Sequence, residues 1–333
     1  MTRSDRSSGA GVVGGKLDRR GFLRTAGTGL AAAGILGVDL AAAPQRAAAA
    51  GAGGDQGTLI VGGSAQFRTL DPGRTIEVNG MMVEKVTYDT LVTFDGEDLR
   101  NPRPHLATGW KVGADARAFT FTLRPGVRFA SGNELTSADV KWTFDRVLNL
   151  KANTIFLFDG VESVDAPDPR TVVIHTKAPQ LSLIPILSHP GLGILDSKVL
   201  IQNGGDAGPE AKNTDHAEPY LFQHSAGSGP FMIQSYTAGQ ELVLVRNPRF
   251  WGSPAGLERI VIRDIPDPVT QALQVIRGDL DIASNIGPDQ IPPLSRVPNV
   301  VVKASPSATT FQPVARCGRG FRRSSPSKVT SVS

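Results

Sequence analysis

The sequence has little of what builds disulfide frameworks and metal sites. One cysteine, Cys317, in 333 residues excludes a disulfide framework and a cysteine-rich zinc site. The five histidines are scattered, and the eight-residue spacing of His216 and His224 matches no common metal motif. We therefore expect no metal and no cofactor.

The sequence also lacks the short motifs of common enzymes. It contains no Gly-x-Ser-x-Gly elbow, no His-Glu-x-x-His and no glycine loop that ends in Lys-Ser or Lys-Thr. The run Gly62-Gly63-Ser64 follows a predicted strand, but it has neither the lysine nor the third glycine of a phosphate-binding loop. These absences predict that the protein is not an enzyme.

The body of the chain has no excess of positive charge. The formal net charge is +4, yet residues 1–50 carry +4 and residues 312–333 carry +5, which leaves −5 on residues 51–311. The basic character therefore belongs to the two ends, and a nucleic acid partner is not expected.

The N-terminal 50 residues have the pattern of an export signal. Arg19 and Arg20 precede an uncharged, Ala- and Gly-rich stretch over 25–38, and small residues at 41–43 and 47–50 offer peptidase sites. The paired arginines resemble the twin-arginine type of signal, which implies the twin-arginine translocase as a partner. The stretch is too short and too weakly apolar for a membrane span. The alternative, a core helix, conflicts with its many glycines.

This signal sets the expected location. We expect a mature chain that begins between residues 44 and 54 and lies in the periplasm or elsewhere outside the cytoplasm. No cysteine lies near either peptidase site, so a lipoprotein is not expected.

The body of the chain alternates strand and helix patterns. A capping box at Thr136 and Asp139 predicts a helix, and Asp267, Pro268 and Gly278 have the start and stop signals of another. A third helix is expected to begin at 79 or 80. Strands are expected at 58–62, 119–123, 127–129, 171–175, 241–245 and 279–283. The mixture indicates an α/β or α+β fold, in two lobes.

Several separated motifs carry a specific resemblance. They are Thr69-Leu70-Asp71-Pro72, Tyr88-Asp89-Thr90-Leu91, the segment from Pro104 to Val140, Gly227-Ser228-Gly229-Pro230-Phe231, Asn247-Pro248-Arg249-Phe250-Trp251-Gly252 and Gly278-Asp279-Leu280-Asp281-Ile282. In this order they resemble the extracytoplasmic solute-binding proteins of family 5, the peptide/nickel class that serves ATP-binding-cassette (ABC) importers. The resemblance covers residues 58 to 311.

The resemblance implies a clamshell fold of the periplasmic-binding-protein type (type II, family 5). Residues 58–90 and 186–310 are then the first lobe, and 91–185 are an inserted subdomain. After Phe311 the sequence departs from the family, because 312–333 form a basic tail without an acidic residue. We expect this tail to be disordered. It indicates a frameshift or a mis-called gene end, so that the second lobe is largely missing; the alternative is a genuine disordered basic tail.

The resemblance also implies which residues contact a ligand. The loop after Asp71 borders the cleft in the family, and its backbone pairs with an extended peptide, a role that we assign to Glu77, Val78 and Asn79. The Glu77 carboxylate either meets a ligand ammonium or is simply solvated. Phe156 is the aromatic expected in the cleft, with a place in the core as the alternative.

The expected function is therefore the substrate-binding component of an ABC importer, which captures dipeptides or oligopeptides and delivers them to a membrane permease. A non-functional remnant, a permease-docking module and an exported hydrolase are the alternatives. Relatives of this class bind dipeptides, oligopeptides, nickel chelates or sugars, and the sequence does not choose among them. If the second lobe is missing, we expect peptide affinity no better than about millimolar.

Overall fold

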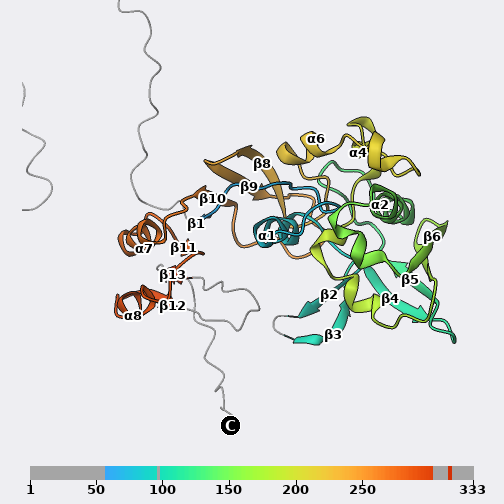
Figure 1. Ribbon diagram of the computed structural model, residues 1–333, viewed down its shortest axis with the longest axis horizontal. Coiled ribbons are helices and arrows are strands. Elements are labelled where there is room, and N and C mark those ends of the chain that lie inside the picture. The colour runs from blue at the N-terminus through green and yellow to red at the C-terminus, as the bar shows by residue number, and fades with distance from the viewer. Residues whose placement is uncertain (1–56, 96–97, 303–313, 317–333) are drawn as a thin grey trace, which may run out of the picture. The chain divides into compact units, whose positions relative to one another are not determined.

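A computed structural model describes residues 57–95, 98–302 and 314–316 of the chain (Figure 1). Arg19 and Arg20 lie outside the described residues, as does most of the basic tail. Among the helices of the described residues, none has the length and apolar character needed to cross a bilayer.

A seven-stranded mixed sheet is built from the two ends of the described chain. Its strand order is β12-β13-β11-β1-β10-β9-β8. The strands are β1 (Thr58–Gly63), β8 (Phe231–Thr237), β9 (Glu241–Arg246), β10 (Arg259–Asp264), β11 (Ile282–Ala283), β12 (Val300–Val302) and β13 (Val314–Arg316). The central strand β1 pairs in parallel with β10 and β11, and every other pairing in this sheet is antiparallel.

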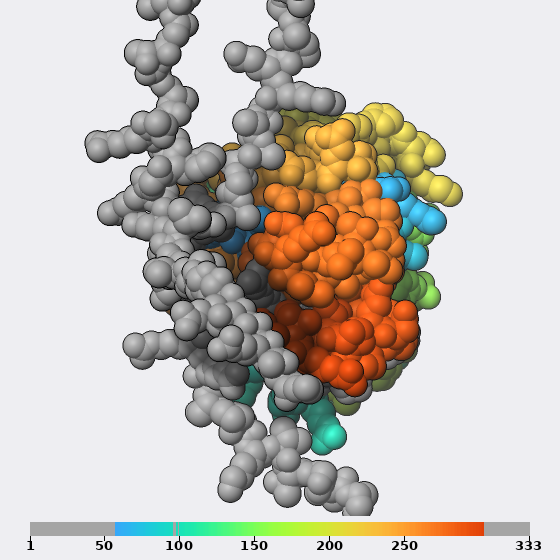
Figure 2. All heavy atoms as spheres, turned by 90° about the vertical axis from the view of Figure 1, so that its left-hand side faces the viewer, coloured from blue at the N-terminus to red at the C-terminus, as the bar shows by residue number. Residues whose placement is uncertain are grey.

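The helix after β10 has the start and stop that its sequence predicts. In α7 (Pro268–Arg277), the Asp267 side chain accepts a hydrogen bond from the Thr270 amide, and Gly278 ends the helix at φ 87°. The buried face of α7 packs with α8 (Ile291–Leu294) and β12 in one hydrophobic cluster. Figure 2 looks onto this end of the sheet, where α7 and α8 form the surface.

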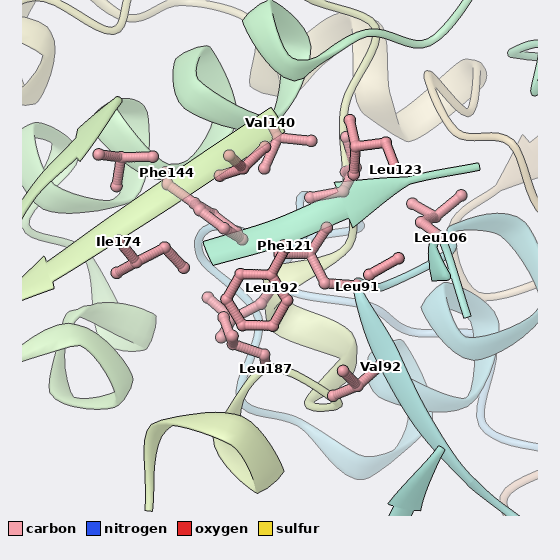
Figure 3. Packing of buried hydrophobic residues seen from close by; sticks show 14 of the residues in the cluster. Leu91, Val92, Leu106, Phe121, Leu123, Val140, Phe144, Ile174, Leu187 and Leu192 are labelled. Atoms are coloured by element: carbon pink, nitrogen blue, oxygen red, sulfur yellow. The ribbon is translucent and has the colours of Figure 1, made fainter. Parts of the chain in front are cut away.

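A second, four-stranded antiparallel sheet lies in the middle of the sequence. Its order is β4 (Ala107–Val112), β5 (Ala118–Leu123), β7 (Thr171–Thr176) and β6 (Val161–Asp168). The helix α2 (Ser137–Leu150) packs on β6 and β7, and it begins with the predicted capping box of Thr136 and Asp139. The largest core cluster joins this sheet to α2; Figure 3 shows Phe121 beside Leu187 and Leu192 in it.

The remaining elements connect the two sheets. They are α1 (Val78–Thr87), a two-stranded ribbon of β2 (Val92–Asp95) and β3 (Asp98–Pro104), α3 (Leu183–Ile186), α4 (Ser197–Gln202), α5 (Ala211–Thr214), α6 (Glu218–Gln223) and the 3₁₀ turns η1 (Asn153–Phe158) and η2 (Pro190–Leu192).

Three expectations from the sequence differ from the structure. The strand expected at 279–283 is shorter, because β11 comprises only Ile282–Ala283. Residues 127–129 do not form a strand with β5; β5 pairs with β4 and β7 instead, and Arg128 makes only an isolated bridge to Glu134. Residues 314–316, which we assigned to a disordered tail, form β13 between β11 and β12. The physical reason is that β13 pairs with β11 on one side and with β12 on the other, so its backbone groups gain hydrogen-bond partners that an unpaired tail would lack.

Candidate ligand-binding site

The loop between β1 and α1 is held in shape by Asp71. Its carboxylate accepts a hydrogen bond from the Gly73 amide at 3.0 Å, and its carbonyl accepts from the amides of Arg74 and Thr75 at 2.9 and 3.0 Å. An aspartate that bonds to the backbone two residues ahead is typical of a tight turn. The hydrogen bonds of Asp71 therefore fix the backbone conformation at the start of the segment that leads to Glu77.

A buried guanidinium ties this loop to the helical part of the fold. Arg146 on α2 donates to Asp71 at 2.9 and 2.6 Å and to Asp215 at 2.8 Å through each of two nitrogens. The side chains of all three residues are fully buried. Arg74, one-quarter exposed, adds a second guanidinium that contacts both carboxylates. Two arginines and two aspartates thus balance one another inside the protein.

The electrostatics of this cluster favour its ionised form. Burial by itself would raise the pKa of Asp215, but the hydrogen bonds and charge of Arg146 outweigh it and hold that pKa below its usual range. The Asp215 carboxylate therefore stays ionised at neutral pH, and its ion pairs with Arg146 and Arg74 help to anchor the loop.

The structure places the three predicted loop residues at the start of α1. Glu77 is the N-cap residue with extended backbone, at φ −85° and ψ 136°, whereas Val78 and Asn79 lie in the first helical turn. The expected pairing of Val78 and Asn79 with an added peptide strand is therefore not available. The first-turn amides of a helix have no partner within the helix, so they remain potential donors to a ligand.

The Glu77 carboxylate already has a partner. It pairs with the Arg68 guanidinium at 3.0 Å, and the Arg68 side chain is 91% exposed. An ion pair this exposed contributes little to stability, on the order of 0–1 kcal/mol. A cationic group of a ligand could therefore replace Arg68 as the partner of the Glu77 carboxylate at little cost in free energy.

The second predicted segment lies against the first. In η1, the Asn153 side chain donates to the Arg74 carbonyl at 3.0 Å, and the Thr154 hydroxyl donates to the Gly73 carbonyl. Phe156, in the same turn, is 60% exposed. Its place is therefore not the core, which was the alternative to a role in a cleft.

A hollow of about 360 Å³ opens where these two segments meet. It is lined by Arg68, Thr69, Arg74, Ile76, Glu77 and Asn153. The lining combines a carboxylate, guanidinium groups, an amide and the exposed Ile76 side chain, which suits a ligand with charged ends and an apolar part. Within the part of the chain that the structure describes, no group of three or more acidic, histidine or cysteine side chains is placed to hold a metal ion.

A second polar cluster, centred on Asp89, brings several of the separated sequence motifs into contact. The buried Asp89 carboxylate accepts hydrogen bonds from the Ser228 hydroxyl at 2.8 Å and from the Trp251 indole at 2.8 Å, and it lies 2.9 Å from the His105 ring. Arg124 lies over the Trp251 ring at 4.7 Å. Four of the motifs thus meet at one carboxylate, so their shared role is to hold the scaffold.

Sequence reasoning missed the buried cluster of Asp71, Arg146 and Asp215. Asp71 was visible only as part of a motif, and Arg146 as one charge on an amphipathic helix. The one available signal was that Arg146 lies next to the apolar positions Phe144 and Val147 on the same helix. This signal does not indicate which carboxylates Arg146 would pair with. The partners are 75 and 69 residues away in the sequence.

Comparison with known proteins identifies the family. The family model "Bacterial extracellular solute-binding proteins, family 5 Middle" matches residues 101–315. The chain belongs to this family. Because the chain belongs to family 5, its two sheets and the loop anchored by Asp71 are parts of a solute-binding protein fold.

Individual relatives agree with this assignment. The chain is 34% identical over 252 residues to the probable D,D-dipeptide-binding periplasmic protein DdpA of Escherichia coli (strain K12), covering 75% of this chain and 47% of that protein. It is 29% identical over 255 residues to the glutathione-binding protein GsiB of Salmonella typhi, covering 75% and 46%.

A solved structure shares the fold. The periplasmic binding protein DppA from Helicobacter pylori, in complex with the peptide STSA, superposes with a TM-score of 0.64 at 24% identity, over 74% of this chain and 50% of that one. The chain therefore spans about half the length of the relatives that it matches.

Proposed function

We propose that this chain is the extracytoplasmic substrate-binding component of an ABC importer and that it captures peptides for delivery to a membrane permease. The observation that carries the proposal is the hollow between the Asp71-anchored loop and η1. It offers a carboxylate, guanidinium groups and apolar surface. This composition suits reversible capture of a zwitterionic ligand.

The comparisons support peptides as the ligand class. Two relatives are named for a D,D-dipeptide and for glutathione, and the DppA structure holds the peptide STSA. Family membership supports a solute-binding role, outside the cytoplasm and without catalysis.

The finer assignments belong to the same proposal. Glu77, Val78, Asn79 and Phe156 contact the ligand, and Arg19 and Arg20 direct export through the twin-arginine translocase. Residues 58–90 and 186–310 form one lobe with 91–185 inserted. The division into a seven-stranded and a four-stranded sheet supports these boundaries, although the core of the inserted part continues to Ile194.

The test compares two exposed apolar side chains. Phe156→Ala removes an exposed ring from η1, the turn that supplies Asn153 to the hollow, and Leu181→Ala, at a residue 68% exposed, is the matched control. Peptide binding is measured by calorimetry and by ligand-observed NMR, with the unfolding midpoint of each variant recorded alongside. We expect Phe156→Ala to weaken binding by about 1–2 kcal/mol, with the unfolding midpoint unchanged.

Two results would contradict the proposal. Equal binding by the Phe156 and Leu181 variants would remove Phe156 from the site. Saturable binding of a nickel chelate or a sugar, with none for any peptide, would replace the proposed ligand class.

A further inference from the structure

The exposed side of α7 is apolar, although the helix already buries another apolar side. Val269, Leu273 and Ile276 lie at positions i, i+4 and i+7, so they share one face of the helix. They are 54%, 47% and 42% exposed, and Figure 2 shows α7 at the surface of the molecule. Three of the ten large apolar residues that are exposed in the described part of the chain thus lie together on one short helix. We name these three residues the α7 stripe.

The polar residues of α7 do not occupy its most exposed positions. Thr270 and Gln274 are half-buried, whereas the α7 stripe is exposed. Ala272 and Val275 form the buried side, which packs with residues of β1, β12 and α8 in one hydrophobic cluster. A helix that is apolar over most of its circumference is normally covered on more than one side. We therefore expect the α7 stripe to be covered by a partner.

The α7 stripe is symmetric about its own centre. Val269 and Ile276 are seven residues apart, and the midpoint between them lies between Ala272 and Leu273. If a second copy of α7 packs antiparallel around a two-fold axis at this midpoint, Val269 of each chain faces Ile276 of the other. Leu273 of both chains then meets its counterpart beside the axis. A two-fold interface requires a surface of this kind, which is complementary to itself.

The charges at the ends of α7 have the same symmetry. Asp267 is the N-cap, Arg277 lies in the last turn, and both are exposed. Their midpoint is Ala272, so the same two-fold axis places each Asp267 near the Arg277 of the other copy. The Oδ2 atom of Asp267 accepts hydrogen bonds from the amide and the hydroxyl of Thr270, which leaves Oδ1 for a guanidinium. A parallel pair would instead bring like charges and like ends of the helix dipoles together.

We propose that α7 is the contact surface of a two-fold homodimer, in which the α7 stripes of two copies pack antiparallel. The charges of Asp267 and Arg277 carry the choice of a second copy as the partner, because they are complementary only in this arrangement. One helix from each chain buries less area than a standard interface, so the dimer is transient, with a dissociation constant of about micromolar or weaker. This inference goes beyond the proposed function, because no residue of α7 lines the hollow at Glu77.

Sedimentation velocity of the full chain over a wide range of concentration measures the association. Leu273→Glu places two like charges beside the two-fold axis, and Ile201→Glu, at a residue of α4 that is 56% exposed, is the matched control. We expect the parent chain and Ile201→Glu to form dimers as concentration rises, and Leu273→Glu to stay monomeric. Arg277→Glu should weaken the dimer about tenfold, because two ion pairs become two repulsive pairs.

Cysteine cross-linking tests the antiparallel direction and does not depend on the Leu273 variant. Cys317→Ser first removes the native thiol. In this background, chains with Val269→Cys are mixed with chains with Ile276→Cys, and mass spectrometry identifies the disulfides that form. We expect disulfides between positions 269 and 276, because the antiparallel pair places these positions opposite each other. Ile201→Cys in the same background should form no disulfide dimer.

Several results would overturn the inference. They are a parent chain that stays monomeric at every concentration, equal association of the Leu273 and Ile201 variants, and disulfides that join only like positions. Melting curves at low concentration, where the chain is monomeric, add one more. If Leu273→Glu lowers the melting temperature there while Ile201→Glu does not, the chain covers the α7 stripe itself and the dimer is refuted. Peptide capture is unaffected by any of these results, because it is tested separately at Phe156.

Discussion

Replacing Arg146 by methionine tests the anchor of the candidate site. The substitution keeps part of the side-chain length of Arg146 and removes its charge. It deletes four hydrogen bonds, two to Asp71 and two to Asp215, and leaves both carboxylates buried, with Arg74 as their remaining cation. Breaking a buried ion pair from one side costs about 3–5 kcal/mol, a large part of the 5–15 kcal/mol that stabilises a typical domain.

The loss should depend on pH in a defined direction. In the parent chain the pKa of Asp215 is held below its usual range, so its stabilising contribution is present at neutral pH and is lost as pH falls through that lowered pKa. In Arg146→Met the buried carboxylates lose most of their compensating charge and take up protons more readily. The stability gap between parent and variant should therefore narrow as pH falls from 7 toward 4.

Urea unfolding followed by circular dichroism at pH 4, 5, 6 and 7 measures this gap. Arg277→Met, at the exposed end of α7, is the control and should change the free energy of unfolding by less than about 0.5 kcal/mol. A loss below about 1 kcal/mol for Arg146→Met, or a gap that stays constant with pH, would refute the reasoning.

Two further predictions concern stability and export. Burial raises the pKa of Glu84 to about 8, with the Asp71 charge adding to the effect, so the parent chain should lose stability as pH rises from 4.5 toward 8. Glu84→Gln should remove this slope and gain up to about 3 kcal/mol at pH 7, as measured by urea unfolding; the same slope in both proteins would show that Glu84 is not responsible. Replacing Arg19 and Arg20 by lysine should leave precursor in the cytoplasm, as measured by cell fractionation and immunoblotting; normal export of that double variant would show that another signal is used.

Local signals in the sequence were sufficient for the helices that have caps. The box at Thr136 and Asp139 predicted the start of α2, and the Asp267, Pro268 and Gly278 pattern predicted both ends of α7, because caps depend on neighbours three or four positions away.

Contacts between distant segments could not be predicted in the same way. The role of Arg146 depends on Asp71 and Asp215, which only the folded chain brings to it. Val78 and Asn79 were expected to offer an extended edge, but the helix begins one residue after Glu77, because the Asp71 turn and the buried Val83 face fix where α1 starts.

Labelling the chain with ¹⁵N and titrating it with an alanine tripeptide or tetrapeptide that ends in phenylalanine tests the central claim most directly. Backbone amide shifts report where the peptide lies even when binding is weak. The account predicts saturable shifts that cluster at residues 76–85 and 153–157. It is contradicted if no amide shifts saturate, or if the saturable shifts fall instead on the surface of α7 and α8.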